Sequence, residues 1–204
     1  MKLYLARHGQ TALNREQRFQ GSLDEPLDET GFAQALLLEE RLPADISRIV
    51  SSPLLRARQT AESVAGARGL PVHVVEAFRE RHYGVFEGLN RQELETQHGE
   101  LWRRGVVRLW DEAPPGGETM REVRIRVEQG LHRLQREQEG EVVLLVAHGF
   151  VARMVHFLLH GLAEADIHQC VMLGNAEFGV YELPPGNEVP QTAPQPTPRA
   201  GGAA

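Results

Sequence analysis

The chain has 204 residues, 41% of them hydrophobic, and a formal net charge of −6 at pH 7. A chain of this length and composition is expected to form one globular domain with a sizeable core. The acidic balance argues against a general nucleic-acid-binding protein, which would normally present a basic face. Any cationic site must therefore be local.

The cysteine count and the hydropathy pattern restrict the cellular setting. Cys170 is the only cysteine, so the sequence excludes an internal disulfide and a Cys-rich zinc site. No apolar run approaches the roughly 18 residues of a membrane span, and a charge at Arg7 interrupts the N-terminal run too early for a secretory signal. We therefore expect a cytoplasmic protein that binds no membrane. The sequence leaves open whether it forms a homodimer.

The first predicted elements are two strands and a helix between them. Residues 3–6 form a short apolar run that predicts a buried strand. From Thr30 to Leu42 the apolar residues follow a helical stripe. Residues 49–50 then predict a second strand, which leads into a pair of serines.

A helix start follows this second strand. Ser52 precedes Pro53, and this pair predicts a helix through Ala65 with Ser52 as its N-terminal cap. The first turn of such a helix has free backbone N–H groups and a partial positive charge, both of which suit an anion. Residues 72–75 supply a further strand.

The C-terminal half continues the alternation of helices and strands. Residues 119–122 form a capping box that opens a helix, and Gly140 ends it. A strand is then predicted at 142–147, a helix at 150–159 and an edge strand at 178–183. The pattern predicts an α/β fold, a three-layer sandwich whose mainly parallel central sheet has helices on both faces.

The end of the sequence differs in composition from the rest. Residues 184–204 are rich in Pro, Gly and Ala and contain too few apolar side chains to offset the entropy of ordering them. We therefore predict a folded domain at 1–183 and a disordered tail at 184–204.

Several polar residues follow predicted strands. His8 comes directly after the first strand, His148 follows the strand at 142–147, and Arg56 lies one turn into the helix after the second strand. The carboxyl ends of parallel strands meet at one edge of a sheet, where ligands of open α/β folds bind. Two imidazoles and two arginines, Arg7 and Arg56, therefore predict a site for a phosphate-like anion.

Four motifs in this order resemble the histidine phosphatase superfamily, which includes the phosphoglycerate mutases. They are Arg7-His8-Gly9, the arginine motif that begins at Arg56, the acid motif from Glu80 to Gly84, and His148-Gly149. The resemblance extends from residue 1 to about residue 183. It implies a phosphoglycerate mutase-like fold, a small phosphorylated metabolite as substrate, and no metal or other cofactor.

The resemblance also implies a role for each residue. His8 is the implied nucleophile, and an imidazole suits that role because much of it is neutral near pH 7. Glu80 is the implied proton donor, and it later activates water. The other implied site residues are Arg7, Arg56 and His148 around the phosphoryl group, and Asn14, Gln20, Gly21, Arg81, Tyr83 and Gly149 at the substrate pocket.

The motifs alone do not separate a phosphatase from a mutase. Residues 89–91 and 98–104 resemble the cofactor-dependent phosphoglycerate mutases, which then carry a long insertion that closes over the substrate and excludes water. Here only residues 105–118 precede the next helix, and 114–119 resemble the phosphatase branch. We therefore expect a phosphomonoester hydrolase, with a mutase as the alternative. A catalytically silent phosphate-ester-binding protein is a third reading.

Two other patterns have more ordinary explanations. His156 and His160 have the spacing of a metal pair on a helix, but no third ligand is evident, so we expect no metal site. Trp102 and Trp110 stand among arginines, which would suit stacking on nucleic-acid bases. In an acidic chain, core tryptophans or a lid over the substrate are better explanations.

Overall fold

The computed structural model describes residues 1–138, 140–170 and 172–183, so the predicted tail at 184–204 lies outside the described residues. A five-stranded sheet has the order β3-β2-β4-β1-β5. Neighbouring strands among β1 to β4 are parallel, whereas β5 pairs antiparallel with β1 at the edge. The strands are β1 (Lys2–Arg7), β2 (Arg48–Ser51), β3 (Val72–Val74), β4 (Val142–Ala147) and β5 (Phe178–Glu182).

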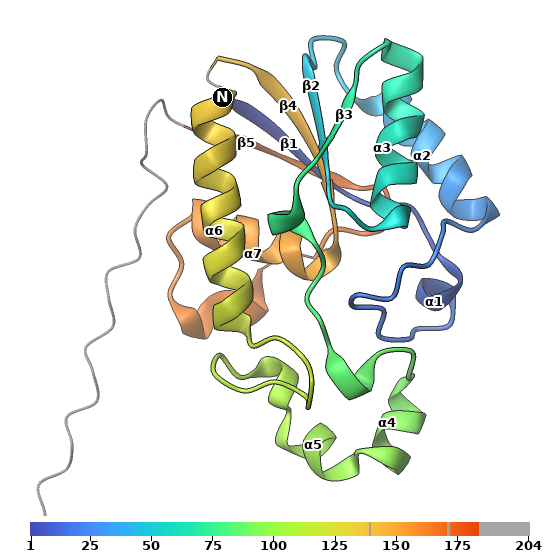
Figure 1. Cartoon of the computed structure of the whole chain (residues 1–204), viewed down its shortest axis with the longest axis vertical. Coiled ribbons are helices and arrows are strands. Elements are labelled where there is room, and N and C mark those ends of the chain that lie inside the picture. The colour runs from blue at the N-terminus through green and yellow to red at the C-terminus, as the bar shows by residue number, and fades with distance from the viewer. Residues whose placement is uncertain (139, 171, 184–204) are drawn as a thin grey trace, which may run out of the picture.

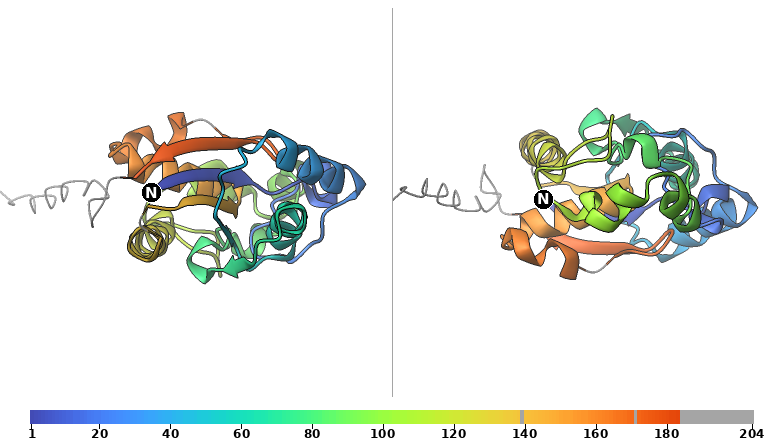
Figure 2. Two further views of the ribbon diagram at one scale, coloured as in Figure 1. Left: turned by 90° about the horizontal axis from the view of Figure 1, so that it is seen from above. Right: turned by 90° about the horizontal axis from the view of Figure 1, so that it is seen from below.

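Helices cover both faces of this sheet (Figures 1 and 2). The α-helices are α1 (Ala12–Arg15), α2 (Glu29–Arg41), α3 (Leu55–Arg68), α4 (Arg91–Gln97), α5 (Gly99–Arg104), α6 (Met120–Glu137) and α7 (Gly149–Leu159). Short 3₁₀ helices are η1 (Glu76–Phe78), η2 (Gly84–Phe86), η3 (Val106–Arg108) and η4 (Glu164–Gln169). The predicted α/β class is confirmed.

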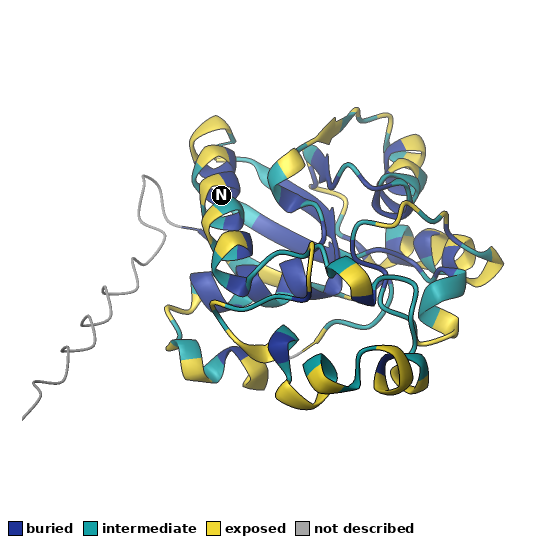
Figure 3. Ribbon diagram, turned by 60° about the horizontal axis from the view of Figure 1, so that its bottom comes forward, coloured by how far each residue is buried: buried dark blue, intermediate teal, exposed yellow. Residues whose placement is uncertain are grey.

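Alternate residues of the strands build two separate cores. Leu3 and Leu5 of β1 pack with α6 and α7, whereas Tyr4 and Ala6 pack with α2 and α3. Successive side chains of a strand point to opposite faces, so a strand that is apolar on both faces must be covered on both. Figure 3 shows the resulting pattern, with buried central strands and helices whose outer faces are exposed.

The helix that follows β2 begins later than the sequence predicts. It starts at Leu55, its N-cap is Leu54, and no side chain caps it, so the prediction of Ser52 as the cap is wrong. The Ser52 hydroxyl lies instead 2.6 Å from Nε2 of His148. The backbone N–H of Leu55 donates to Asp24 at 2.5 Å, so this N–H is not free to bind an anion. The predicted cap at Thr119 is present, with its capping box.

The segment from η2 to η3 forms a small unit beyond the carboxyl ends of the parallel strands, at the bottom of Figure 1. Phe86, Leu94 and Val106 form its core, and the partly buried Trp102 packs there against Phe19. Trp110 packs elsewhere, beside Phe157 of α7. Both tryptophans are therefore packing residues.

No helix within the described part of the chain has both the length and the apolarity that a membrane crossing requires.

Candidate active site

His8 lies immediately beyond the carboxyl end of β1 and is almost fully buried. Its Nδ1 lies 2.6 Å from the carbonyl oxygen of Gly9. Because a carbonyl can only accept, Nδ1 holds the ring proton and donates it to Gly9. In the neutral ring, Nε2 then has a lone pair, which accepts a long hydrogen bond of 3.3 Å from Nε of Arg56. Nε2 is therefore the ring nitrogen that carries the lone pair of this imidazole.

The surroundings of His8 keep it neutral. Burial is the main cause that holds the pKa of His8 well below its ordinary value of 6.5, and the positive charges of Arg56 and Arg7 lower this pKa further. A positive imidazolium would have to be desolvated beside two guanidinium groups. The lone pair on Nε2 is therefore present at neutral pH.

The glycine after His8 is needed for close backbone packing. A Cβ atom on Gly9 would lie only 2.4 Å from the carbonyl oxygen of Gly31. The backbone N–H of Gly9 also donates to the Thr60 hydroxyl at 3.0 Å, which ties the loop to α3. These contacts fix the carbonyl of Gly9, which sets the tautomer of His8.

Two arginines, the fully buried Arg56 and the partly buried Arg7, lie close enough to His8 for their charges to act on it. Arg56 is fully buried and donates through Nη1 to the carbonyl of Leu23 at 2.6 Å and through Nη2 to that of Gly21 at 2.8 Å. Burial lowers the pKa of Arg56 to about 10, so it stays charged at neutral pH. Arg7 donates to the carbonyl of Leu173 at 2.9 Å, and among the described residues its buried Nε has no acceptor.

His148, the residue after β4, lies next to His8 with ring centroids 5.2 Å apart. Burial, followed by the charge of Arg56, holds the pKa of His148 well below its ordinary value. The Ser52 hydroxyl accepts from the N–H of Leu54 and contacts Nε2 of His148. Nδ1 of His148 is buried without a partner among the described residues. A buried polar atom without a partner, in a ring next to His8, suits contact with a bound anion such as a phosphoryl group.

The carboxyl group of Glu80 is fixed by two backbone N–H groups. Oε1 accepts from Arg81 at 2.9 Å, and Oε2 accepts from Phe150 at 3.2 Å, in the first turn of α7. Each oxygen has two lone pairs, so each has one left for a proton or a ligand.

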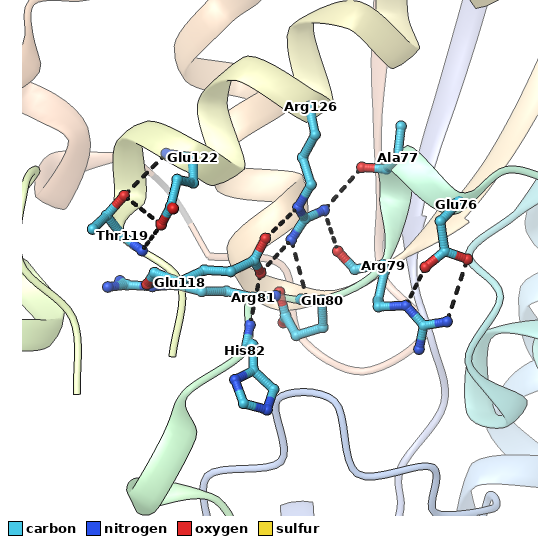
Figure 4. A network of polar contacts seen from close by, with 10 residues as sticks. All are labelled: Glu76, Ala77, Arg79, Glu80, Arg81, His82, Glu118, Thr119, Glu122 and Arg126. Carbon is cyan, nitrogen blue, oxygen red and sulfur yellow. Dashed lines mark hydrogen bonds and ion pairs between the residues drawn. The ribbon is translucent and has the colours of Figure 1, made fainter. Parts of the chain in front are cut away.

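An ion pair on α6 fixes the segment that leads to Glu80 (Figure 4). Nε and Nη2 of Arg126 donate to the two carboxylate oxygens of Glu118, at 2.8 and 2.9 Å. Oε2 of Glu118 also accepts from the backbone N–H of His82 at 2.9 Å. The same guanidinium also donates to the carbonyls of Ala77, Arg79 and Glu80. One arginine thus holds the backbone on both sides of the acid.

These side chains surround a cavity of about 260 Å³. The residues predicted for the site that line it are Arg7, His8, Asn14, Gln20, Gly21, Arg56, Glu80, Tyr83 and Gly149. His148 lies behind His8 and is fully buried. Arg81 is also fully buried, donates to the carbonyls of Glu118 and Val107, and stacks on Tyr83. Arg81, which the resemblance placed at the pocket, is therefore behind its wall and not among the lining residues.

Two of the lining side chains have a polar hydrogen that they can donate. The Oδ1 of Asn14 accepts from the N–H of Thr11 and from Asn175, which leaves the amide NH₂ of Asn14 without a protein acceptor among the described residues. Burial raises the pKa of Tyr83 above its ordinary value, so its phenol keeps its proton. Both groups suit a ligand rich in acceptor oxygens.

Six lining residues were not predicted from the sequence. They are Gln17, Arg18, Phe19, Phe150, Arg153 and Met172. Phe150 and Arg153 follow Gly149 by one and four positions on a predicted helix, and residues four apart lie on one face. This spacing could have identified Arg153, and Phe150 by its place directly after the His148-Gly149 motif, whereas nothing in the sequence indicates that Phe19 or Met172 approaches the site.

The sequence comparisons agree with this arrangement. Residues 3–192 match the histidine phosphatase superfamily (branch 1). The chain belongs to this superfamily. The resemblance carried by the four motifs is therefore confirmed. Among curated proteins, the chain is similar to the "Probable phosphoglycerate mutase GpmB" of Photorhabdus laumondii, with 38% identity over 73% of this chain and 70% of that protein.

Solved structures of the superfamily have the same fold. Bacillus stearothermophilus YhfR is 31% identical, with a TM-score of 0.84 over 91% of this chain and 93% of that one. A mycobacterial glucosyl-3-phosphoglycerate phosphatase in complex with VO3 is 32% identical, with a TM-score of 0.81 over 88% and 91%. The alpha-ribazole phosphatase from Shigella flexneri is 26% identical, with a TM-score of 0.80 over 90% and 91%.

Proposed function

We propose that this histidine phosphatase superfamily member hydrolyses phosphate monoesters of small metabolites through a phosphohistidine formed on His8. The observation that supports this most directly is the hydrogen bond from Nδ1 of His8 to Gly9, which leaves the Nε2 lone pair available in a cavity lined by Arg7 and Arg56. A phosphoryl group has two negative charges, so fixed cations around it stabilise both its binding and its transfer.

In the first step, Nε2 of His8 attacks phosphorus. The N–P bond forms as the ester P–O bond breaks, and the departing alkoxide takes a proton from the Glu80 carboxyl. The backbone N–H groups of Arg81 and Phe150 hold this carboxyl at the edge of the cavity. Arg7, Arg56 and the NH₂ group of Asn14 would bind the non-bridging oxygens.

The second step returns the enzyme to its starting state. The Glu80 carboxylate takes a proton from water, the water oxygen attacks phosphorus, and the N–P bond breaks to release inorganic phosphate and neutral His8. His148 assists as a neutral donor. The Ser52 hydroxyl accepts from the N–H of Leu54 and can donate its own proton to Nε2 of His148. Nε2 is then the acceptor of the neutral imidazole, and the ring proton is on Nδ1.

Hydrolysis is favoured over isomerisation because water can reach the intermediate. None of residues 89–118 lines the cavity within the described chain. The segment that would have to close over the cavity is short. Backbone hydrogen bonds tie its end to the segment after Glu80: the N–H of Glu118 donates to the carbonyl of His82 at 2.8 Å, and the N–H of Val85 donates to the carbonyl of Pro115 at 3.1 Å. A mutase needs a lid that keeps water from the phosphohistidine.

The printed names of the curated relatives favour phosphoglycerate mutase as the second candidate. An assay of 3-phosphoglycerate with and without 2,3-bisphosphoglycerate separates the two reactions. We expect release of inorganic phosphate to exceed interconversion of 3- and 2-phosphoglycerate in both mixtures. Isomerisation faster than phosphate release would establish the mutase instead. If no phosphomonoester in a broad screen were turned over, the chain would be a binding protein.

A further inference from the structure

The cavity beside His8 contains a cation that the chemistry above does not use. Arg153 lines the cavity from α7, as do Gly149 and Phe150 in the first turn of that helix. Residues four apart on a helix lie on the same face, so Gly149 and Arg153 belong to one wall. This wall begins at the phosphoryl-binding end, because a Cβ atom on Gly149 would lie 3.8 Å from Cζ of Arg7.

Arg153 differs from the other cavity arginines in having no partner. Arg18 forms ion pairs with Glu93 and Glu16, and Arg7 and Arg56 donate to backbone carbonyls. Within residues 1–138, 140–170 and 172–183, Arg153 makes no hydrogen bond or ion pair, and its Nε is buried without an acceptor. A buried donor without an acceptor is unfavourable, so a ligand that supplies one would be bound more tightly.

The dimensions of the cavity restrict such a ligand. Its volume of about 260 Å³ is just below the usual range for small-molecule sites, so the part of a ligand that it encloses is small. A helix rises about 1.5 Å per residue, so the backbone of Arg153 is about 6 Å beyond that of Gly149. The distance from the phosphoryl-binding end therefore matches a molecule of few carbons.

We propose that Arg153 binds a second anionic group, a carboxylate or a phosphate, on the alcohol part of the substrate. This inference rests on the proposed hydrolase function and assigns its substrate class, a short phosphate monoester with an additional anion. The planar guanidinium can hold either oxyanion with two parallel hydrogen bonds. Arg103 and Arg104, which stand in the mutase-like stretch, are exposed on α5 and do not line the cavity.

A matched pair of competitors tests this assignment. Glycerol 3-phosphate has a CH₂OH group where 3-phosphoglycerate has a carboxylate, and the two are otherwise the same. Their inhibition constants against p-nitrophenyl phosphate hydrolysis are measured with the wild-type protein, Arg153→Gln and the control Arg103→Gln. Glycerol 1,3-bisphosphate, as a third competitor, keeps the middle hydroxyl group and has a CH₂–O–phosphate group in place of the carboxylate.

We expect wild-type protein and Arg103→Gln to bind 3-phosphoglycerate more tightly than glycerol 3-phosphate. Arg153→Gln should weaken the binding of 3-phosphoglycerate by about 10- to 100-fold, the usual effect of losing a hydrogen bond between charged groups. It should weaken the binding of glycerol 3-phosphate much less. Tighter binding of the bisphosphate than of 3-phosphoglycerate would identify phosphate as the preferred second anion.

Three results would overturn the role of Arg153. The first is equal inhibition constants of 3-phosphoglycerate and glycerol 3-phosphate with the wild-type protein. The second is an equal weakening of the binding of both compounds by Arg153→Gln. The third is loss of the preference for 3-phosphoglycerate in Arg103→Gln. If the wild-type protein failed to hydrolyse p-nitrophenyl phosphate, the hydrolase function would fall instead. Dissociation constants of the same compounds from calorimetry would then still decide the role of Arg153.

Discussion

The guanidinium of Arg126 and the carboxylate of Glu118 form a two-point ion pair that joins α6 to the segment before and after Glu80. Arg126 does not line the cavity, so we propose that it affects catalysis only through the position of Glu80. Arg126→Lys retains the charge but cannot reach the two oxygens and three carbonyls at once.

We expect Arg126→Lys to lower kcat for an alkyl phosphate by up to roughly 10²-fold, which is the size of effect that a misplacement of about 1 Å can have. KM should change little, and kcat for p-nitrophenyl phosphate should fall less, because its phenolate leaves without a proton. Arg133→Lys, an exposed position on the same helix, is the control. Equal losses for alkyl and aryl esters would contradict a role through Glu80.

Glu80→Gln keeps the shape of the side chain but removes the transferable proton. Phosphorylation of His8 by an alkyl phosphate should slow by roughly 10²- to 10⁴-fold, the usual contribution of general acid catalysis. With p-nitrophenyl phosphate the first step should proceed and water activation should fail, so a burst of p-nitrophenol precedes slow turnover. Rapid-quench kinetics measures both. An equal slowing of the first step for both esters would make Glu80 a binding or structural residue.

The pH dependence of the first step should reflect the lowered pKa of His8. In the proposed mechanism its neutral form attacks phosphorus, and burial, together with the charges of Arg56 and Arg7, moves the pKa of His8 well below 6.5. The rate constant for His8 phosphorylation should therefore show no fall as the pH drops through 6.5, once the second ionisation of the substrate is taken into account. Single-turnover rates between pH 5 and 8 test this, and a decline centred near 6.5 would contradict it.

The same pKa shifts predict how stability depends on pH. Below about pH 6.5 the unfolded chain binds protons at His8 and His148 that the folded protein does not, so the free energy of unfolding falls as the pH falls. Each histidine should contribute a slope of about 1.4 kcal/mol per pH unit. The difference in the free energy of unfolding between pH 7.5 and 5.5, measured with urea, should be smaller for His8→Asn than for the wild-type protein. An unchanged difference would mean that His8 titrates normally in the folded state.

The sequence predicts those parts of the site that follow from chain order. His8 and His148 come directly after strands of one parallel sheet, so their proximity could be expected before the structure was known. The layer arrangement was also predictable, because strands that are apolar on both faces need helices on both. These inferences use local patterns whose geometry does not depend on distant residues.

The remaining features depend on contacts between distant segments. Ser52 looks like a helix cap in the sequence, but its hydroxyl faces His148, which is 96 positions away. Arg81 was expected at the pocket, but the carbonyls of Val107 and Glu118 hold it behind the wall. Arg126 has no motif around it, and its role follows only from how α6 packs beside Glu80. No local pattern encodes such contacts.

Phosphorylation of His8 distinguishes the proposed mechanism from any other, and trapping the intermediate tests it most directly. The protein would be mixed with a ³²P-labelled phosphomonoester, quenched within one turnover, and mapped by peptide analysis, with His8→Ala as the control. We predict one labelled peptide that contains His8, with a label that is stable to alkali, labile to acid, and absent from His8→Ala. Label on Ser52 or His148, or turnover that persists in His8→Ala, would contradict this mechanism.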